Sequence, residues 1–207
     1  MLFRSFIGGG FSNTASGAYS KVGGGRNNNA NSTSSAIGGG GYNSALATYA
    51  TIAGGGGNTA SGYAATAAGG QSNTASGTRS TIAGGHGSTA SGACSFVGGG
   101  CGHNASGNWA TISGGYGNTA SGQLSYAAGY VNAASGVRST VAGGWGNTAS
   151  GYASAVVGGR GNTASGVCST VGGGQANVAS GSLSTIGGGL CNTIYNLSAT
   201  CCWGNTI

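Results

Sequence analysis

Cysteine and histidine are the side chains of this chain that could bind a metal ion or serve as nucleophile and base. Zinc sites usually pair cysteines two to four residues apart, with further Cys or His ligands at a matching spacing. No Cys-x-x-Cys pair occurs, so the sequence predicts no metal site and no cofactor. The cysteines are Cys94, Cys101, Cys168, Cys191, Cys201 and Cys202.

The complete absence of Asp and Glu excludes several classes of enzyme. Glycosidases with paired carboxylates, triads supported by an acid and carboxylate-lined calcium loops all need side chains that this chain lacks. His86 falls in an expected turn and His103 in a column of asparagines, and neither is expected to have an acid or a nucleophile arranged around it. We therefore predict no catalytic residue and no enzymatic activity.

Covalent modification is the remaining chemistry that the sequence suggests. A disulfide within or between subunits is a hypothesis for the cluster Cys191, Cys201 and Cys202, whereas Cys94, Cys101 and Cys168 are expected to be small turn residues. The triplet Asn-x-Ser/Thr, the acceptor for N-glycosylation, begins at Asn31, Asn104 and Asn196.

The charge pattern argues against nucleic acid and membrane partners. Six Lys and Arg give a formal charge of +6, but they stand far apart and form no basic stripe. No apolar run approaches the ~20 residues that a bilayer-spanning helix needs. The cations are Arg4, Lys21, Arg26, Arg79, Arg138 and Arg160.

A repeat of fifteen residues must position all of these side chains. Each row reads Ile/Val-x-Gly-Gly-x-x-Asn-Thr-Ala-Ser-Gly-x-x-Ser-Thr, and one row is a residue short beside Gly129. With 50 Gly, no Pro and few large apolar residues, the chain cannot fill the core of an ordinary globule. Such a period indicates a solenoid.

Alternation within the row predicts two short strands per coil. In one strand the inward positions are seven, nine and eleven, and in the other they are fourteen, one and three. The chain turns between the strands at positions four to six and twelve to thirteen. We expect an all-β, two-sided parallel solenoid of about fourteen coils, a single domain over 1–207 with an irregular terminal coil at 190–207. The predicted core column is Ile7, Val22, Ile37, Ile52, Ile82, Val97, Ile112, Val141, Val156, Val171 and Ile186.

The asparagines at position seven are expected to stack as a ladder, each amide donating to and accepting from the amide one coil away. Such a ladder would satisfy buried polar groups and penalise any slip of register. Representative members are Asn13, Asn58, Asn73, Asn118, Asn147 and Asn162.

The half-row Asn-Thr-Ala-Ser-Gly followed by Ser-Thr-Ile-x-Gly, as at Asn73 to Gly84, resembles the head repeats of trimeric autotransporter adhesins. The resemblance implies a left-handed roll, homotrimeric assembly, display at a cell or virus surface and binding to a glycan or receptor. No heptad stalk and no membrane-anchor segment accompany it. The rows also show a weaker similarity to grass ice-binding rolls, with Ala where those have Val.

The two ends of the chain share the phase of the row, and neither carries a polar cap. Uncapped strand edges invite another chain to pair. One hypothesis is a head-to-tail filament with a junction formed by Met1, Phe3, Trp203 and Ile207; the alternative is a fragment of a longer roll.

Two outward surfaces could serve function. Thr and Ser columns, interrupted near Asn29, Ala133 and Val178, could pack against other copies or order water as ice-binding rolls do. Aromatic residues in the variable turns could anchor a receptor or another subunit. The sequence favours an extracellular or cell-surface fibre subunit, with surface adhesion as a second role; an adhesin head or viral fibre, and an ice-binding protein, are the alternatives. The projecting aromatics are Phe11, Tyr19, Tyr49, Trp109, Tyr116 and Trp145.

Overall fold

The computed structural model describes residues 4–195, which form short strands joined by turns and bends. The chain is a parallel β-solenoid of about thirteen turns, and each turn adds one strand to each of two sheets. The predicted all-β, two-sided solenoid is confirmed, while the fourteenth coil, around Cys201, lies outside the described residues. The chain divides into two compact units, residues 1–103 and 104–207, which we call the N-terminal and C-terminal units.

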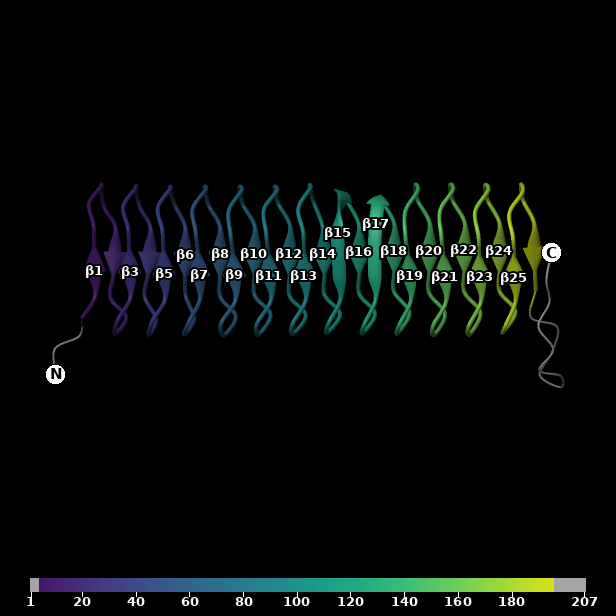
Figure 1. Ribbon diagram of the computed structural model, residues 1–207, viewed down its shortest axis with the longest axis horizontal. Helices are drawn as coiled ribbons and strands as arrows, with labels where there is room; N and C mark the ends of the chain where they lie inside the picture. Colours follow the sequence, from purple (N-terminus) through teal and green to yellow (C-terminus); the bar gives the residue numbers. More distant parts are fainter. Residues whose placement is uncertain (1–3, 196–207) are drawn as a thin grey trace. The chain divides into compact units, whose positions relative to one another are not determined.

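In the N-terminal unit, odd-numbered strands form one sheet and even-numbered strands form the other (Figure 1). The odd strands are β1 (Phe6–Ile7), β3 (Lys21–Val22), β5 (Ala36–Ile37), β7 (Thr51–Ile52), β9 (Thr66–Ala67), β11 (Thr81–Ile82) and β13 (Phe96–Val97). The even strands are β2 (Thr14–Ala15), β4 (Asn29–Ala30), β6 (Ser44–Ala45), β8 (Thr59–Ala60), β10 (Thr74–Ala75) and β12 (Thr89–Ala90).

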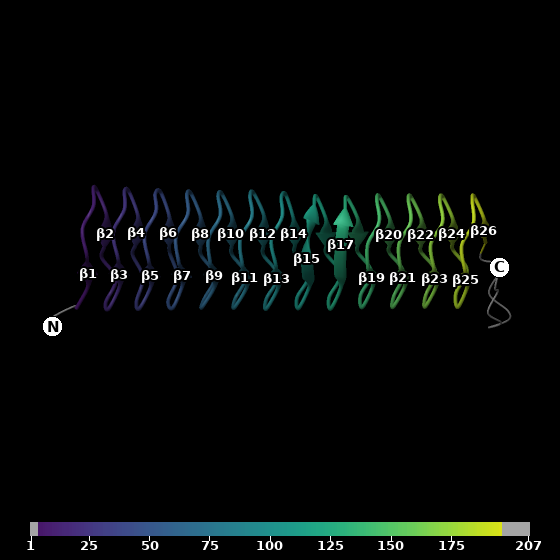
Figure 2. The same cartoon turned by 45° about the horizontal axis from the view of Figure 1, so that its top comes forward.

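The C-terminal unit repeats this arrangement, and its even and odd strands occupy separate rows in Figure 2. The even strands are β14 (Asn104–Ala105), β16 (Thr119–Ala120), β18 (Ala133–Ala134), β20 (Thr148–Ala149), β22 (Thr163–Ala164), β24 (Val178–Ala179) and β26 (Thr193–Ile194). The odd strands are β15 (Thr111–Tyr116), β17 (Tyr126–Tyr130), β19 (Thr140–Val141), β21 (Ala155–Val156), β23 (Thr170–Val171) and β25 (Thr185–Ile186).

The core of each unit is a thin double column of small apolar side chains. Ile82 on the odd sheet and Ala75 on the even sheet are both completely buried. Each row pairs in register with the row fifteen residues away, as Thr81 with Phe96 and Ile82 with Val97. Because alternate strand residues point to opposite faces, this register keeps one residue of each two-residue strand inside the coil.

Left-handed backbone at row positions four, six and thirteen turns the chain. Gly25, at position four, has φ +92°, and a Cβ there would collide with the carbonyl oxygen of Gly40 in the next coil. Glycine is required at this position on both grounds. Positions six and thirteen adopt φ near +55°, as in Ser72 and Arg79, without needing glycine. The turn positions predicted from the row are confirmed.

The short row beside Gly129 is absorbed locally. Strands β15 and β17 are longer than the others, and their register shifts between Ile112 and Gly115. Pairing resumes with Gly115 opposite Gly129 and Tyr116 opposite Tyr130. The bulge therefore takes up the missing residue at one turn, and from Ala133 opposite Thr148 onward the paired residues are fifteen positions apart again.

Candidate functional site: ladders, faces and rims

The asparagine column is the main polar element inside the coils. In Asn147, the amide nitrogen Nδ2 donates to the carbonyl oxygens of Gly143 and Gly159 at 3.0 Å each. Its Oδ1 accepts the backbone N–H of Asn162 at 2.9 Å. The same three-bond pattern recurs at Asn58 and Asn162. Each asparagine thereby ties its own turn to the next coil.

The ladder differs from the predicted one in its partners. Asn177 Nδ2 donates to Asn162 Oδ1 at 3.2 Å, but the recurring bonds of the described asparagines go to the backbone. The prediction of amide-to-amide stacking was therefore wrong as the general rule. The physical reason is that the carbonyl at position three of the same row and the N–H at position seven of the next row face into the turn, and the asparagine satisfies both; its amide also donates to the position-four carbonyl of the next coil. The predicted members Asn58, Asn73, Asn118, Asn147 and Asn162 are buried, and Asn13 is half-buried.

The ladder is interrupted at two successive rows of the N-terminal unit. Ser88 N–H donates to Asn73 Oδ1 at 3.0 Å, and His103 N–H donates to the Ser88 hydroxyl at 3.2 Å. Serine therefore keeps the acceptor role of asparagine but cannot supply its two donors. His103 is buried at the position predicted for it.

In the predicted core column, the members from Val22 to Ile186 are all buried, whereas the first member is not. Ile7, on the first described strand β1, is 44% exposed, so its assignment to the core was wrong. Strand β1 has a described neighbour, β3, on one side. Among the described residues, Ile7 therefore has no second coil over it of the kind that covers its counterparts.

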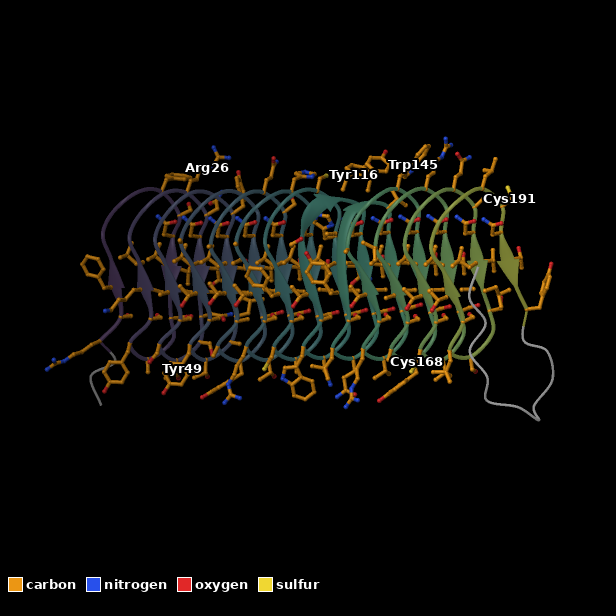
Figure 3. The ribbon with its side chains drawn as sticks, turned by 45° about the vertical axis from the view of Figure 1, so that its right-hand side comes forward. Arg26, Tyr49, Tyr116, Trp145, Cys168 and Cys191 are labelled. Atoms are coloured by element: carbon orange, nitrogen blue, oxygen red, sulfur yellow. The ribbon has the colours of Figure 1, made fainter. Side chains whose placement is uncertain are left out.

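The four described cysteines, Cys94, Cys101, Cys168 and Cys191, are all free thiols. Cys191 and Cys168 project from opposite rims of the C-terminal unit (Figure 3). Cys201 and Cys202, the other members of the predicted disulfide cluster, lie outside the described residues.

Cys101 and His86 contradict the expectation that neither histidine has a nucleophile beside it. The Cys101 Sγ lies 3.7 Å from His86 Nδ1. The prediction was wrong because it did not take into account the residues at the same position of the neighbouring rows. Both residues stand at row position five in consecutive rows, and the fifteen-residue register brings equal positions side by side.

The outward face of the even sheet is uncharged and regularly patterned. Thr59, Thr74 and Thr89 lie in register in the N-terminal unit, as do Thr148 and Thr163 in the C-terminal unit. Within the described strands, the outward positions of this sheet hold no Lys or Arg. Asn29 opposite Thr14, Ala133 opposite Thr119 and Val178 opposite Thr163 interrupt the threonine column as expected. Ser44 opposite Thr59 and Asn104 opposite Thr119 are further non-threonine positions in it.

The two rims of each unit carry the projecting side chains. In the N-terminal unit, Arg26 and Tyr49 extend from opposite rims (Figure 3). The six aromatics predicted to project, Phe11, Tyr19, Tyr49, Trp109, Tyr116 and Trp145, are all exposed.

Aromatic rings and phenol oxygens, rather than carboxylates, receive three of the rim arginines, Arg26, Arg138 and Arg160. The Arg160 guanidinium lies 3.9 Å from the centre of the Trp145 ring, and Arg138 Nη1 donates to the Tyr152 hydroxyl at 2.7 Å. The Arg26 guanidinium donates to the Tyr42 hydroxyl, and this bond holds the pKa of Tyr42 below its ordinary value. Because the chain contains no acid, cation–π contacts and phenol oxygens take the role of ion-pair partners.

One rim of the C-terminal unit carries a continuous aromatic row at position five. Tyr116 and Tyr130 stack with centroids 5.1 Å apart, and Tyr130 meets Trp145 edge to face at 6.2 Å. The rings occupy one another's faces, so the row presents ring edges and hydroxyls outward. It contributes exposed apolar surface rather than an open stacking platform.

The glycosylation candidates Asn31 and Asn104 are exposed, while Asn196 lies outside the described residues. The junction residues Met1, Phe3, Trp203 and Ile207 also lie outside them. In the range 4–195, no three His or Cys residues gather as metal ligands, and no helix has the length and hydropathy to cross a membrane.

Comparison with protein-family models finds no matching family, and comparison with curated proteins finds no similar protein. A function for this chain must therefore be argued from its edges, faces and rims.

Proposed function

We propose that this chain is a structural subunit of an extracellular fibre, and that copies assemble by adding solenoid coils to one another. The observation that carries the proposal is the end strand β1. Its inward residue Ile7 is 44% exposed, whereas the equivalent Val22 in the next coil is fully buried. Phe11, which follows in the same coil, is 69% exposed. At this end of the described coils, the core column is exposed and forms an apolar surface.

The backbone of β1 favours the same interpretation. Phe6 and Gly8 donate their N–H groups to Ser20 and Val22 in the next coil, at 3.0 and 2.9 Å. In a parallel ladder, the intervening residue directs its N–H and C=O to the opposite side. Ile7 therefore presents unused backbone groups along the direction of stacking. A coil from another copy would meet them with the pairing that the rows use internally.

Edge strands of soluble proteins usually carry charges, prolines or bulges that discourage pairing. Strand β1 pairs with β3 in simple register, the chain contains no proline, and Arg4 is the charge nearest to β1 in sequence. The uncharged outward face of the even sheet would add lateral contact between neighbouring fibres. The exposed rim aromatics would supply surface adhesion as a second role. The extracellular location rests on the resemblance of the rows to adhesin heads.

The test is electron microscopy of the purified chain, together with sedimentation over a range of concentrations. We expect wild-type fibres, dispersed particles for Ile7→Lys, and fibres for the control Val157→Lys, whose position is 58% exposed on the odd sheet of the C-terminal unit. Wild-type particles that remain single chains at every concentration would sink the proposal, and discrete trimers would favour an adhesin head instead.

Ice binding is a second candidate, favoured by the in-register threonines of the even sheet. Strands repeat at about 4.8 Å, so the hydroxyl and methyl groups of Thr59, Thr74 and Thr89 form a regular one-dimensional array. Thermal hysteresis that disappears in Thr74→Lys, but persists in Thr81→Lys on the opposite sheet, would support this function. Absence of hysteresis in the wild-type protein would eliminate it.

A further inference from the structure

The pair formed by Cys101 and His86 brings a nucleophile and a base together on one rim of the N-terminal unit. The two residues form a parallel bridge between consecutive coils, and their side chains approach to 3.7 Å between Sγ and Nδ1. Backbone bonds hold both turns: His86 N–H donates to Gly100, and Gly102 N–H donates to His86, each at 2.9 Å. The spacing of the pair is therefore set by the solenoid register.

The surroundings leave the pair open to small molecules. Gly87 and Gly102 follow the two residues, and a Cβ at either glycine would meet no atom within 4 Å. Within the described N-terminal unit, the neighbour of His86 in the preceding coil at position five is the uncharged Gln71. His103, two residues beyond Cys101, is buried inside the coil.

The chemistry of the pair is that of a thiol beside a general base. A neutral imidazole with its proton on Nε2 accepts the thiol proton at Nδ1, and the thiolate is the form of cysteine that attacks. Activation of a cysteine by an adjacent histidine is a common route to a reactive thiol. Among the described cysteines, Cys94, Cys168 and Cys191 are more exposed than Cys101, and Cys101 is the one with a histidine contact.

We propose that Cys101 is a nucleophilic thiol activated by His86, and that it is the site at which this chain undergoes exchange with small disulfides such as glutathione disulfide. His86 takes the thiol proton as the Cys101 sulfur attacks one sulfur of the disulfide. The new bond joins Cys101 to that half, and the S–S bond of the reagent breaks. The other half leaves as a thiolate and recovers the proton from the imidazolium. The leaving thiol carries away the two electrons that Cys101 gives up.

The experiment measures the rate at which each cysteine of the intact chain forms a mixed disulfide with glutathione, using peptide mapping by mass spectrometry. We expect Cys101 to react at least about tenfold faster than Cys94 at pH 7, a threshold set below the roughly hundredfold low end for a positioned base. Exposure alone predicts the opposite order, since Cys94, Cys168 and Cys191 are the more exposed thiols.

His86→Gln is the matched variant, because glutamine already occupies position five at Gln71 and Gln175. We expect it to lower the Cys101 rate at pH 7 to that of Cys94 while leaving the circular dichroism spectrum unchanged. Cys101→Ser should remove the fast phase and keep the slow ones. Equal rates for Cys101 and Cys94 at pH 7, or an unchanged Cys101 rate in His86→Gln, would overturn the proposal.

Discussion

Replacement of Asn147 by alanine tests whether the asparagine ladder stabilises the solenoid. The change deletes three hydrogen bonds: two from Nδ2 to the carbonyls of Gly143 and Gly159, and one from the Asn162 N–H to Oδ1. Each typical bond contributes about 1 kcal/mol net, and a buried group left without a partner costs about 1 to 3 kcal/mol. Because Asn147 is fully buried, we expect the free energy of unfolding to fall by roughly 3 to 4 kcal/mol.

Asn147→Ser is the graded control, since Ser88 occupies the equivalent position and accepts one N–H of the next coil. It should keep one bond and lose two, and therefore cost about 2 kcal/mol. Denaturant unfolding followed by circular dichroism gives the total loss. Hydrogen exchange at the Asn162 amide locates it, because contacts in a solenoid are between neighbouring coils and the loss should be confined to them. An alanine variant within about 0.5 kcal/mol of wild type, or one more stable than the serine variant, would refute the reasoning.

Four further predictions concern positions with different local constraints. Gly77→Ala should destabilise the chain by more than about 2 kcal/mol, because a Cβ would collide with the next coil's backbone, whereas Gly84→Ala, whose Cβ would meet open space, should cost less than about 1 kcal/mol in the same denaturant assay. Ser80→Ala should be neutral or stabilising by up to about 1 kcal/mol in thermal unfolding, since its buried hydroxyl has no hydrogen-bond partner among the described residues and alanine occupies this row position elsewhere. Ultraviolet titration should show Tyr42 ionising below the ordinary tyrosine pKa, and Arg26→Gln should reduce that difference, leaving the smaller lowering by Asn27; because the folded-state pKa is lowered, the linked stability appears as pH rises through it and is lost as pH falls. Without Asp or Glu to protonate, the folded chain should keep its circular dichroism spectrum between pH 5 and about pH 2, and a carboxylate-like unfolding transition there would contradict this.

The row pattern was sufficient to predict the strands, the inward column and the turns. In a coil with a single interior, alternate strand residues point inward and outward in turn. The alternation therefore predicted that Ile82 is buried and Thr81 is not. The position of the short row beside Gly129 was also recognisable, although the sequence did not show that β15 and β17 would lengthen to absorb it.

The sequence did not predict side-chain contacts between equal row positions of consecutive coils, nor the hydrogen bonds that side chains make to the backbone of the turns. The contact of His86 with Cys101 follows from the register, but it becomes visible only when the rows are stacked and position five is read as a column. The ladder bonds from asparagine to glycine carbonyls depend on turn geometry that residue types alone do not specify. The exposure of Ile7 depends on its place in the first described coil, which no property of the residue itself reveals.

The strict pairing of each residue with the one fifteen positions away also determines how such a chain can change length. Removal of a whole row within one unit would leave each surviving position opposite its own kind, as Thr148 lies opposite Thr163, so glycine would still meet glycine and asparagine would still reach a turn carbonyl. Removal of a single residue instead requires a bulge of the type seen between Ile112 and Gly115. Insertions and deletions of whole rows therefore leave the pairing between coils unchanged, and the natural unit of variation in this fold is the coil.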